Sequence, residues 1–159
     1  MKLHQSPIGQ KDEWITPRHI TDALGPFDLD PCAPEHPPWK IADTHWFQDG
    51  LDGAWFGNVW CNPPFNRYER PLWMEKCANH GRSMLLIPAA TETNAFVDFV
   101  WNRADAILFL KGRPYFHHVN GERAKGNCGT ALCIAGFGFS NAHRLLHSDL
   151  GQAFPLFNH

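Results

Sequence analysis

The sequence predicts a three-layer α/β fold with a mostly parallel sheet and a C-terminal antiparallel hairpin. The clearest observation is Ser83–Pro88, a continuous apolar run of the kind that a strand buried on both faces requires. Helical patterns alternate with such runs along the chain, which is typical of parallel sheets. Two apolar segments, 114–119 and 128–137, flank the polar, glycine-bearing turn over 120–126 and predict the hairpin.

The other elements follow from capping signals and apolar spacing. Thr16-Pro17 predicts a helix start, because threonine is an N-cap residue and proline is favoured at the first helical position. Gly25-Pro26 ends this helix. We also expect strands over 27–30, 57–61 and 106–110, and helices over 67–80, 91–102 and 143–150. The segment 40–56 is poorly patterned.

The composition indicates one globular domain over residues 1–159, without a separate target-recognition domain. The chain is 43% hydrophobic and 19% charged, which suits a single core. Its start lacks a signal-peptide core and no apolar run reaches the length of a membrane span, so we expect a cytoplasmic protein. The formal net charge of −2 does not favour nucleic-acid binding, because domains that bind nucleic acids are commonly basic.

The five cysteines predict neither a disulfide framework nor a paired zinc site. Cys128 and Cys133, with His117 and His118 upstream, are candidate zinc ligands. Because Cys133 lies inside an apolar run, we expect it in a strand core and expect no metal.

The four residues Asn62-Pro63-Pro64-Phe65 point to chemistry at an amino group. Proline fixes φ and removes N–H donors, and it holds the preceding residue in extended backbone. The turn therefore offers two acceptors, the Asn62 side-chain oxygen and the Pro63 carbonyl, which suit the two N–H bonds of an aryl amine such as adenine N6. Phe65 adds a stacking face worth roughly 1–3 kcal/mol per base. The alternative is a rigid loop between a strand and a helix.

Five short motifs follow one another in order along the chain. They are Trp14-Ile15-Thr16-Pro17, Asp28-Leu29-Asp30-Pro31-Cys32-Ala33, Asn62-Pro63-Pro64-Phe65, Leu86-Ile87-Pro88-Ala89 and Gly112-Arg113-Pro114-Tyr115-Phe116. This order resembles the phage-type (Dam-like) DNA N6-adenine methyltransferases of phages and prophages. The resemblance implies a Rossmann-like fold of the S-adenosylmethionine-dependent class. It also implies methyl transfer to adenine N6 in double-stranded DNA, in the bacterial or infected host cytoplasm, with no obligate protein partner.

The resemblance also implies where the cofactor binds. The Thr-Pro turn and the turn after the first strand would hold its methionine end, and a carboxylate there can pair with its ammonium. The expected cofactor-binding residues are Thr16, Pro17, Asp28, Asp30, Pro31, Cys32 and Ala33, with Asp43 and Asp49 as candidates for the ribose. Trp46 or Phe47 is a candidate to stack on the cofactor adenine or to pack in the core. The glycine-rich turn usual in the wider class is absent after Asp30.

For DNA, we expect contacts from basic residues in two loops, 66–71 and 111–127. They are Arg67, Lys111, Arg113, Arg123 and Lys125, which could equally be ordinary solvated charges. The asparagine in the motif favours adenine over cytosine N4, where related enzymes commonly carry serine. Two alternatives stay open: an amino-methyltransferase of RNA or protein, and a degenerate binding module that has lost the cofactor. Protection, evasion of host restriction and regulation all remain open as biological roles.

Overall fold

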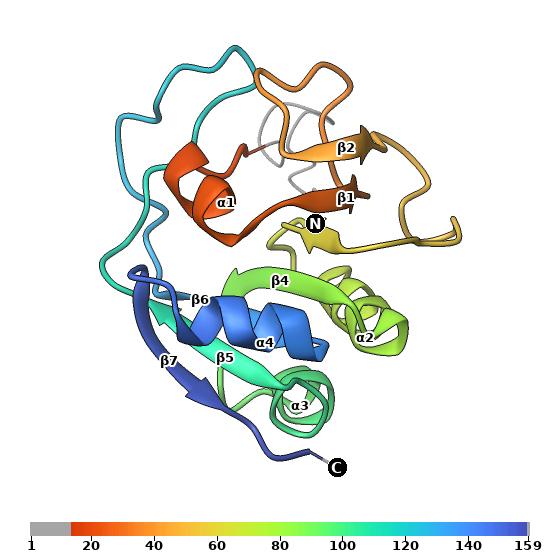
Figure 1. Cartoon of the computed structure of the whole chain (residues 1–159). Helices are drawn as coiled ribbons and strands as arrows, with labels where there is room; N and C mark the ends of the chain where they lie inside the picture. The colour runs from red at the N-terminus through yellow and green to blue at the C-terminus, as the bar shows by residue number, and fades with distance from the viewer. Residues whose placement is uncertain (1–13, 159) are drawn as a thin grey trace, which may run out of the picture.

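The computed structural model describes residues 14–158, which form a seven-stranded mixed sheet between two layers of helices (Figure 1). The strand order is β2-β1-β3-β4-β6-β5-β7. The strands are β1 (Phe27–Asp30), β2 (Ala42–His45), β3 (Val59–Cys61), β4 (Ser83–Pro88), β5 (Ala106–Leu110), β6 (Leu132–Phe137) and β7 (Gly151–Pro155). The helices are α1 (Arg18–Leu24), α2 (Arg70–His80), α3 (Asn94–Phe96), the π-helix η1 (Val97–Trp101) and α4 (Phe139–Leu146).

The central strand β4 shows why the chain forms three layers. Met84 and Leu86 face α1 and α4, while Leu85 and Ile87 face α2, α3 and η1, and all four side chains are fully buried. A strand with apolar side chains on both faces needs a helical cover on each side. In Figure 1, α1 and α4 lie in front of the sheet.

The strand order of the sheet changes direction at β1, because later strands are added first on one side of β1 and then on the other. From β1 the chain passes to β2 on one side and then to β3 on the other, and both pair with β1 in parallel. The crevice beyond the carboxyl ends of the strands at such a reversal is where open α/β sheets bind their ligands. Asp30 ends β1 and Cys61 ends β3, so the turn after Asp30 and the motif beginning at Asn62 both leave the sheet at this crevice.

The expected strands over 27–30, 83–88 and 106–110 are confirmed, but the hairpin is wrong. β6 lies between β4 and β5 and pairs antiparallel with both, and residues 114–119 form no strand. The reason is that β6 is buried along its whole length and needs a buried partner on each edge. The expectation of a mostly parallel sheet is also wrong, because β6 and β7 run antiparallel to their neighbours. Three of the six strand pairings are parallel and three are antiparallel.

Several helix boundaries also differ from the expectation. Thr16 caps nothing: the residue before α1 is Pro17, and the Thr16 hydroxyl accepts a hydrogen bond from the Asn62 amide instead. The helix expected over 91–102 is α3 followed by the π-helix η1, and the helix expected over 143–150 is shifted to α4. The strand expected over 57–61 is the shorter β3, and the helix expected over 67–80 is the shorter α2. The strand β2 lies in the segment 40–56, where no pattern predicted a strand.

No helix within residues 14–158 is long and apolar enough to cross a membrane.

Candidate active site

The Asn62 side chain is oriented by two acceptors on the segment before α1. Its Nδ2 donates to the Trp14 carbonyl at 3.0 Å and to the Thr16 hydroxyl at 3.3 Å. Both partners accept from the amide nitrogen, so they fix the orientation of the Asn62 amide with Nδ2 toward the segment before α1. The Asn62 Oδ1 is thereby turned away from them and, within residues 14–158, accepts no hydrogen bond.

Asn62 and Pro63 line a cavity of about 430 Å³. This volume is within the usual range for small-ligand sites. The Pro63 carbonyl likewise accepts no hydrogen bond from another described residue. The cavity is lined by Trp14, Asn62, Pro63, Phe65, Asn66, Phe116, Ala124, Gly126, Asn127 and Cys128. The cavity therefore combines aromatic walls with two acceptors that have no partner in the described part of the chain.

Two phenylalanines form the aromatic part of this cavity. Phe65 meets Phe116 edge to face, with ring centroids 6.1 Å apart and an interplanar angle of 83°. The Phe65 backbone is held in turn, because Arg70 on α2 donates a hydrogen bond to its carbonyl. The Asn66 side chain closes the turn into α2 by accepting from the backbone N–H of Tyr68 at 2.8 Å. The stacking face is thus held by the Phe116 ring and by the contacts that follow the motif.

Asp30 is a buried carboxyl group at the carboxyl end of β1, with only 5% of its surface exposed. It accepts one hydrogen bond, from the backbone N–H of Cys32 at 3.1 Å. Burial raises the pKa of Asp30 to about 7, and the Cys32 hydrogen bond only partly offsets this. The turn is tied to the end of β2 by backbone bonds from Trp46 to Asp30 and from Ala33 to Trp46. Asp30 is therefore a buried acid without a cationic partner among residues 14–158.

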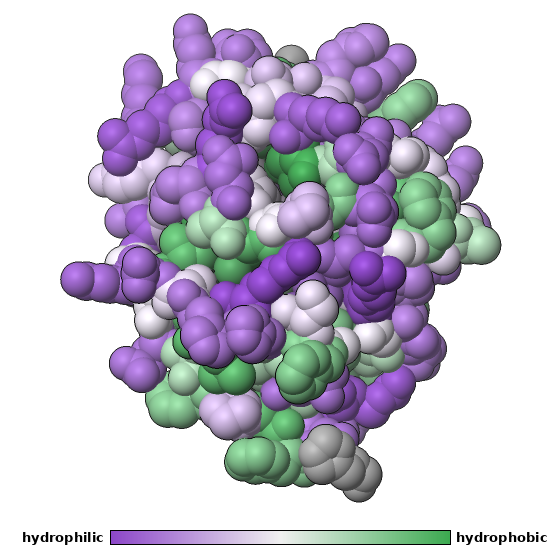
Figure 2. Space-filling view, in the orientation of Figure 1, coloured by the Kyte–Doolittle hydropathy of each residue, from purple (hydrophilic) through white to green (hydrophobic). Residues whose placement is uncertain are grey.

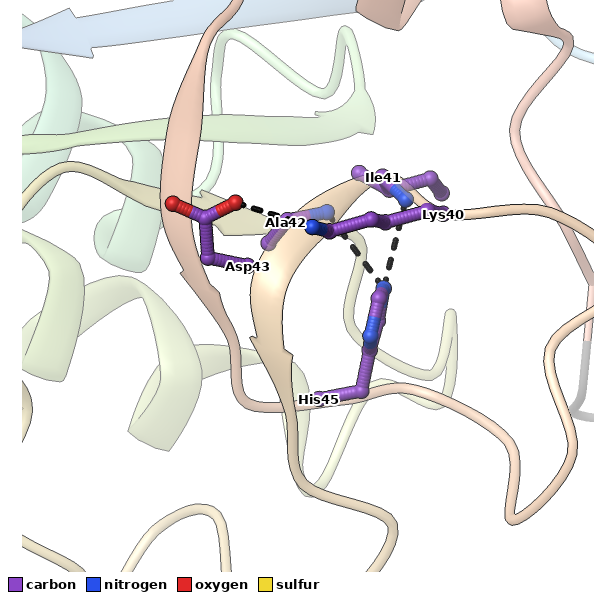
Figure 3. Close-up of polar contacts among 5 residues, drawn as sticks. All are labelled: Lys40, Ile41, Ala42, Asp43 and His45. Carbon is purple, nitrogen blue, oxygen red and sulfur yellow. Dashed lines mark hydrogen bonds and ion pairs between the residues drawn. The ribbon is translucent and has the colours of Figure 1, made fainter.

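The remaining predicted carboxylates have other contacts. Asp28 accepts from the backbone N–H of Asn58 at 2.6 Å and so joins β1 to the start of β3. Asp43 is exposed on β2 and pairs with Lys40 at 3.1 Å, as Figure 3 shows. Asp49 is exposed in a turn with φ of 59°. None of the three lines the cavity that contains Asn62.

Beside Asp43, the His45 side chain ties β2 to the residues just before it (Figure 3). Its Nε2 accepts from the backbone N–H groups of Ile41 and Ala42, at 3.2 and 3.3 Å. Burial lowers the pKa of His45, and the charge of Lys40 lowers it further. His45 is thus held in the neutral form, and its contacts are structural.

The predicted DNA-binding residues fall into separate groups. Lys111, Arg113 and Arg123 line a second cavity beside α1. Arg67 lies elsewhere, after the motif, where its guanidinium covers the ring of Tyr68 at 4.9 Å from the centroid. Lys125 is exposed between two residues that line the Asn62 cavity.

Sequence reasoning does not single out several residues that complete the cavity. Trp14 contributes the carbonyl that holds Asn62, and Phe116 contributes an aromatic wall, although each belongs to one of the five ordered motifs. Asn127 and Cys128 come from the loop before β6, and the sequence marked Cys128 only as a candidate zinc ligand and not as part of this cavity. The signal for all four is spatial, because the segments meet only in the folded chain.

Comparison with known protein families agrees with this arrangement. Residues 4–137 match the family described as DNA N-6-adenine-methyltransferase (Dam). The match contains the Trp14–Pro17 segment, the turn after β1, the Asn62 motif and the loop with Phe116. Neither a comparison with curated proteins nor one with solved structures finds a match. Since the matched region covers most of the chain, the chain belongs to the Dam family of DNA N-6-adenine-methyltransferases.

Proposed function

We propose that the protein transfers a methyl group from S-adenosylmethionine to the N6 amino group of adenine in double-stranded DNA. The observation that carries the proposal is the fixed polarity of the Asn62 amide. Trp14 and Thr16 hold its nitrogen, which leaves its oxygen to accept from an amino group in the cavity.

An adenine inside the duplex cannot reach this cavity, so the base must be flipped out of the stack. Phe65 would then stack on the base, while the Asn62 oxygen and the Pro63 carbonyl accept from the two N6–H bonds. Held in this way, the N6 lone pair is freed from the ring and directed away from the two acceptors. Methyl transfer makes the nitrogen cationic. Because a cationic nitrogen loses its proton readily, no strong base is required. Positioning of this kind contributes roughly 7–11 kcal/mol to catalysis.

The residues at the crevice between β1 and β3 fit the cofactor. When bound, S-adenosylmethionine supplies an electrophilic methyl group on a sulfonium. Asp30 is a buried acid that has no cationic partner among residues 14–158, and an ammonium would provide one through a charge-assisted hydrogen bond. We assign Pro31, Cys32 and Ala33, with Thr16 and Pro17, to the same end of the cofactor. The reversal of strand order beside Asp30 supports a Rossmann-like site, and the antiparallel β6 and β7 lie at the other end of the sheet.

The candidate ribose and DNA contacts come from residues that do not line the Asn62 cavity. We keep Asp43 and Asp49 as ribose candidates because both follow β1 on the side of β2, where the turn after Asp30 is anchored. Asp28 is the weakest of the predicted cofactor residues, since its carboxylate is already bonded to Asn58. Arg67 and Lys125 flank the Asn62 cavity and are proposed to contact the DNA around the flipped base.

The test is methyl transfer from labelled S-adenosylmethionine to unmethylated duplex DNA, followed by digestion to nucleosides. Label in N6-methyladenine is the expected result, and label in N4-methylcytosine would contradict the choice of base. Parallel reactions with RNA and with protein separate the alternative substrates. Calorimetry with S-adenosylmethionine identifies a degenerate binding module, which would show no cofactor binding.

A further inference from the structure

A second cavity, of about 390 Å³, lies between the start of α1 and the segment that follows β5. Among the residues that the structure describes, its lining carries three cations and no carboxylate: Pro17, His19, Ile20, Leu110, Lys111, Gly112, Arg113, Pro114, Tyr115, His117, Arg123 and Leu150. Within residues 14–158, none of these three cations forms an ion pair. In a chain of net charge −2, an unpaired positive cluster around a cavity favours an anionic ligand.

The loop 115–124, which folds back on itself through a turn, separates this cavity from the cavity that contains Asn62. Tyr115, His117 and Arg123 line the cationic side, whereas Phe116 and Ala124 line the other. The segment is held in place by the Ala124-to-Phe116 backbone bond at 2.8 Å and by the antiparallel bridge between Ile15 and His117. A ligand that spans both sites would therefore present a base to one side and negative charge to the other.

Arg123 is arranged to bind a phosphate. Its guanidinium lies over the Tyr115 ring, 3.9 Å from the centroid. Stacking occupies the flat face of the guanidinium and leaves the N–H groups at its edge available. Those N–H groups match two phosphate oxygens at once, a geometry that lysine cannot reproduce.

The surface around this site is consistent with a polar ligand. Figure 2 shows mainly hydrophilic residues around α1 and along the side where the 111–131 segment runs. Hydrophobic residues are more prominent near β7 and the C-terminal end, while α4 shows residues of both kinds. Phe139 and Phe157 are highly exposed.

We propose that this cationic cavity binds backbone phosphate of the DNA strand that carries the target adenine. Arg123, stacked on Tyr115, makes the two-pronged contact, and Lys111 and Arg113 add charge. The inference rests on the proposed function, because a nucleic-acid substrate supplies both the base and the phosphates. Phosphate contacts of this kind position a strand without reading its sequence.

The test measures binding of a fluorescently labelled duplex by anisotropy over a range of KCl concentrations. The double substitution Lys111→Ala/Arg113→Ala should weaken binding and reduce the salt slope by about 0.9 for each phosphate that the variant no longer neutralises. Arg123→Lys should weaken binding roughly tenfold although the charge is kept, as for the loss of one charge-assisted hydrogen bond. Tyr115→Phe, which keeps the ring under the guanidinium, should bind like the parent protein.

Arg103→Ala is the matched control, because it removes one positive charge from a residue that contacts Asn79 in the layer of α2 and η1. Its salt slope should equal that of the parent protein. An unchanged slope in the double variant, or equal affinity for Arg123→Lys, would overturn the proposal, as would a parent protein that binds no DNA. Methyl transfer is assayed separately: DNA binding with the predicted slopes but no label in adenine would refute the proposed function and leave the phosphate site standing.

Discussion

Replacing Asp30 with asparagine should remove the cost of ionising a buried carboxyl group and should also weaken binding of the cofactor. Asp30→Asn keeps the shape of the side chain and the oxygen that accepts from the Cys32 N–H, but it removes the ionisable proton. Burial raises the pKa of Asp30 from 3.8 to about 7 in the folded protein. An unfolded chain releases this proton near the ordinary pKa of aspartate, so the two states hold different numbers of protons between about pH 4 and 7.

The sign follows from the raised pKa. In that pH range the folded state binds more protons than the unfolded state, so the free energy of unfolding falls as the pH rises toward 7. The stabilisation is complete below about pH 4 and is lost above about pH 7. At roughly 1.4 kcal/mol per pKa unit, ionising the buried carboxyl costs on the order of 4 kcal/mol. That is a large share of the roughly 5–15 kcal/mol that stabilises a typical domain.

Urea unfolding at pH 4.5 and pH 8 measures this cost in the parent protein and in Asp30→Asn. The parent should lose stability between the two pH values relative to the variant, by up to about 4 kcal/mol. Calorimetry in the same pH range should show that S-adenosylmethionine binds the parent more tightly as Asp30 ionises, and binds Asp30→Asn weakly at every pH. Parallel stability profiles for the two proteins would refute the assignment of the raised pKa to Asp30.

Three further substitutions test individual contacts. Thr16→Val removes the hydroxyl that accepts from Asn62 and should lower kcat roughly tenfold, with a smaller change in the KM for the cofactor if positioning Asn62 is its main role. Phe65→Ala should weaken base binding by roughly 1–3 kcal/mol, whereas Phe65→Tyr should keep it; equal activity of all three proteins would remove the stacking role. Gly57→Ala should lower the free energy of unfolding by at least 1 kcal/mol or so, because φ is +64° and the new Cβ would lie 2.3 Å from an Asp28 oxygen. Thermal or urea unfolding measures this loss, and a fully stable Gly57→Ala protein would contradict the packing described.

Local patterns predicted the strands whose central residues are apolar and buried. Residues 84–87 and 106–110 are apolar throughout and mostly buried, and burial on both faces leaves such segments few other conformations. The same patterns could not predict that β6 inserts between β4 and β5, because strand pairing depends on contacts between residues far apart in the sequence. The π-helix η1 was missed for a related reason, since its apolar spacing resembles that of an α-helix.

The candidate site also contains residues that the local sequence predicted and residues that only the folded chain brings together. The motif at Asn62 was visible because two prolines and an aromatic side chain constrain a short peptide whatever surrounds it. The role of Thr16 was not, since a threonine before a proline equally suits a helix cap, and its partner Asn62 is 46 residues away. Phe116 could be placed in the cavity only once the chain was folded, because it reaches Phe65 from a loop beyond β5.

The central claim is that the Asn62 oxygen accepts a hydrogen bond from the target amino group. The single-turnover rate of N6-methyladenine formation tests it most directly, measured for the parent protein and Asn62→Ala with cofactor and DNA affinities determined alongside. The account predicts a loss on the order of 10²–10³-fold for Asn62→Ala, with both affinities and the free energy of unfolding largely retained. A rate close to that of the parent would contradict the account, and a loss explained entirely by unfolding would return the motif to the role of a rigid loop.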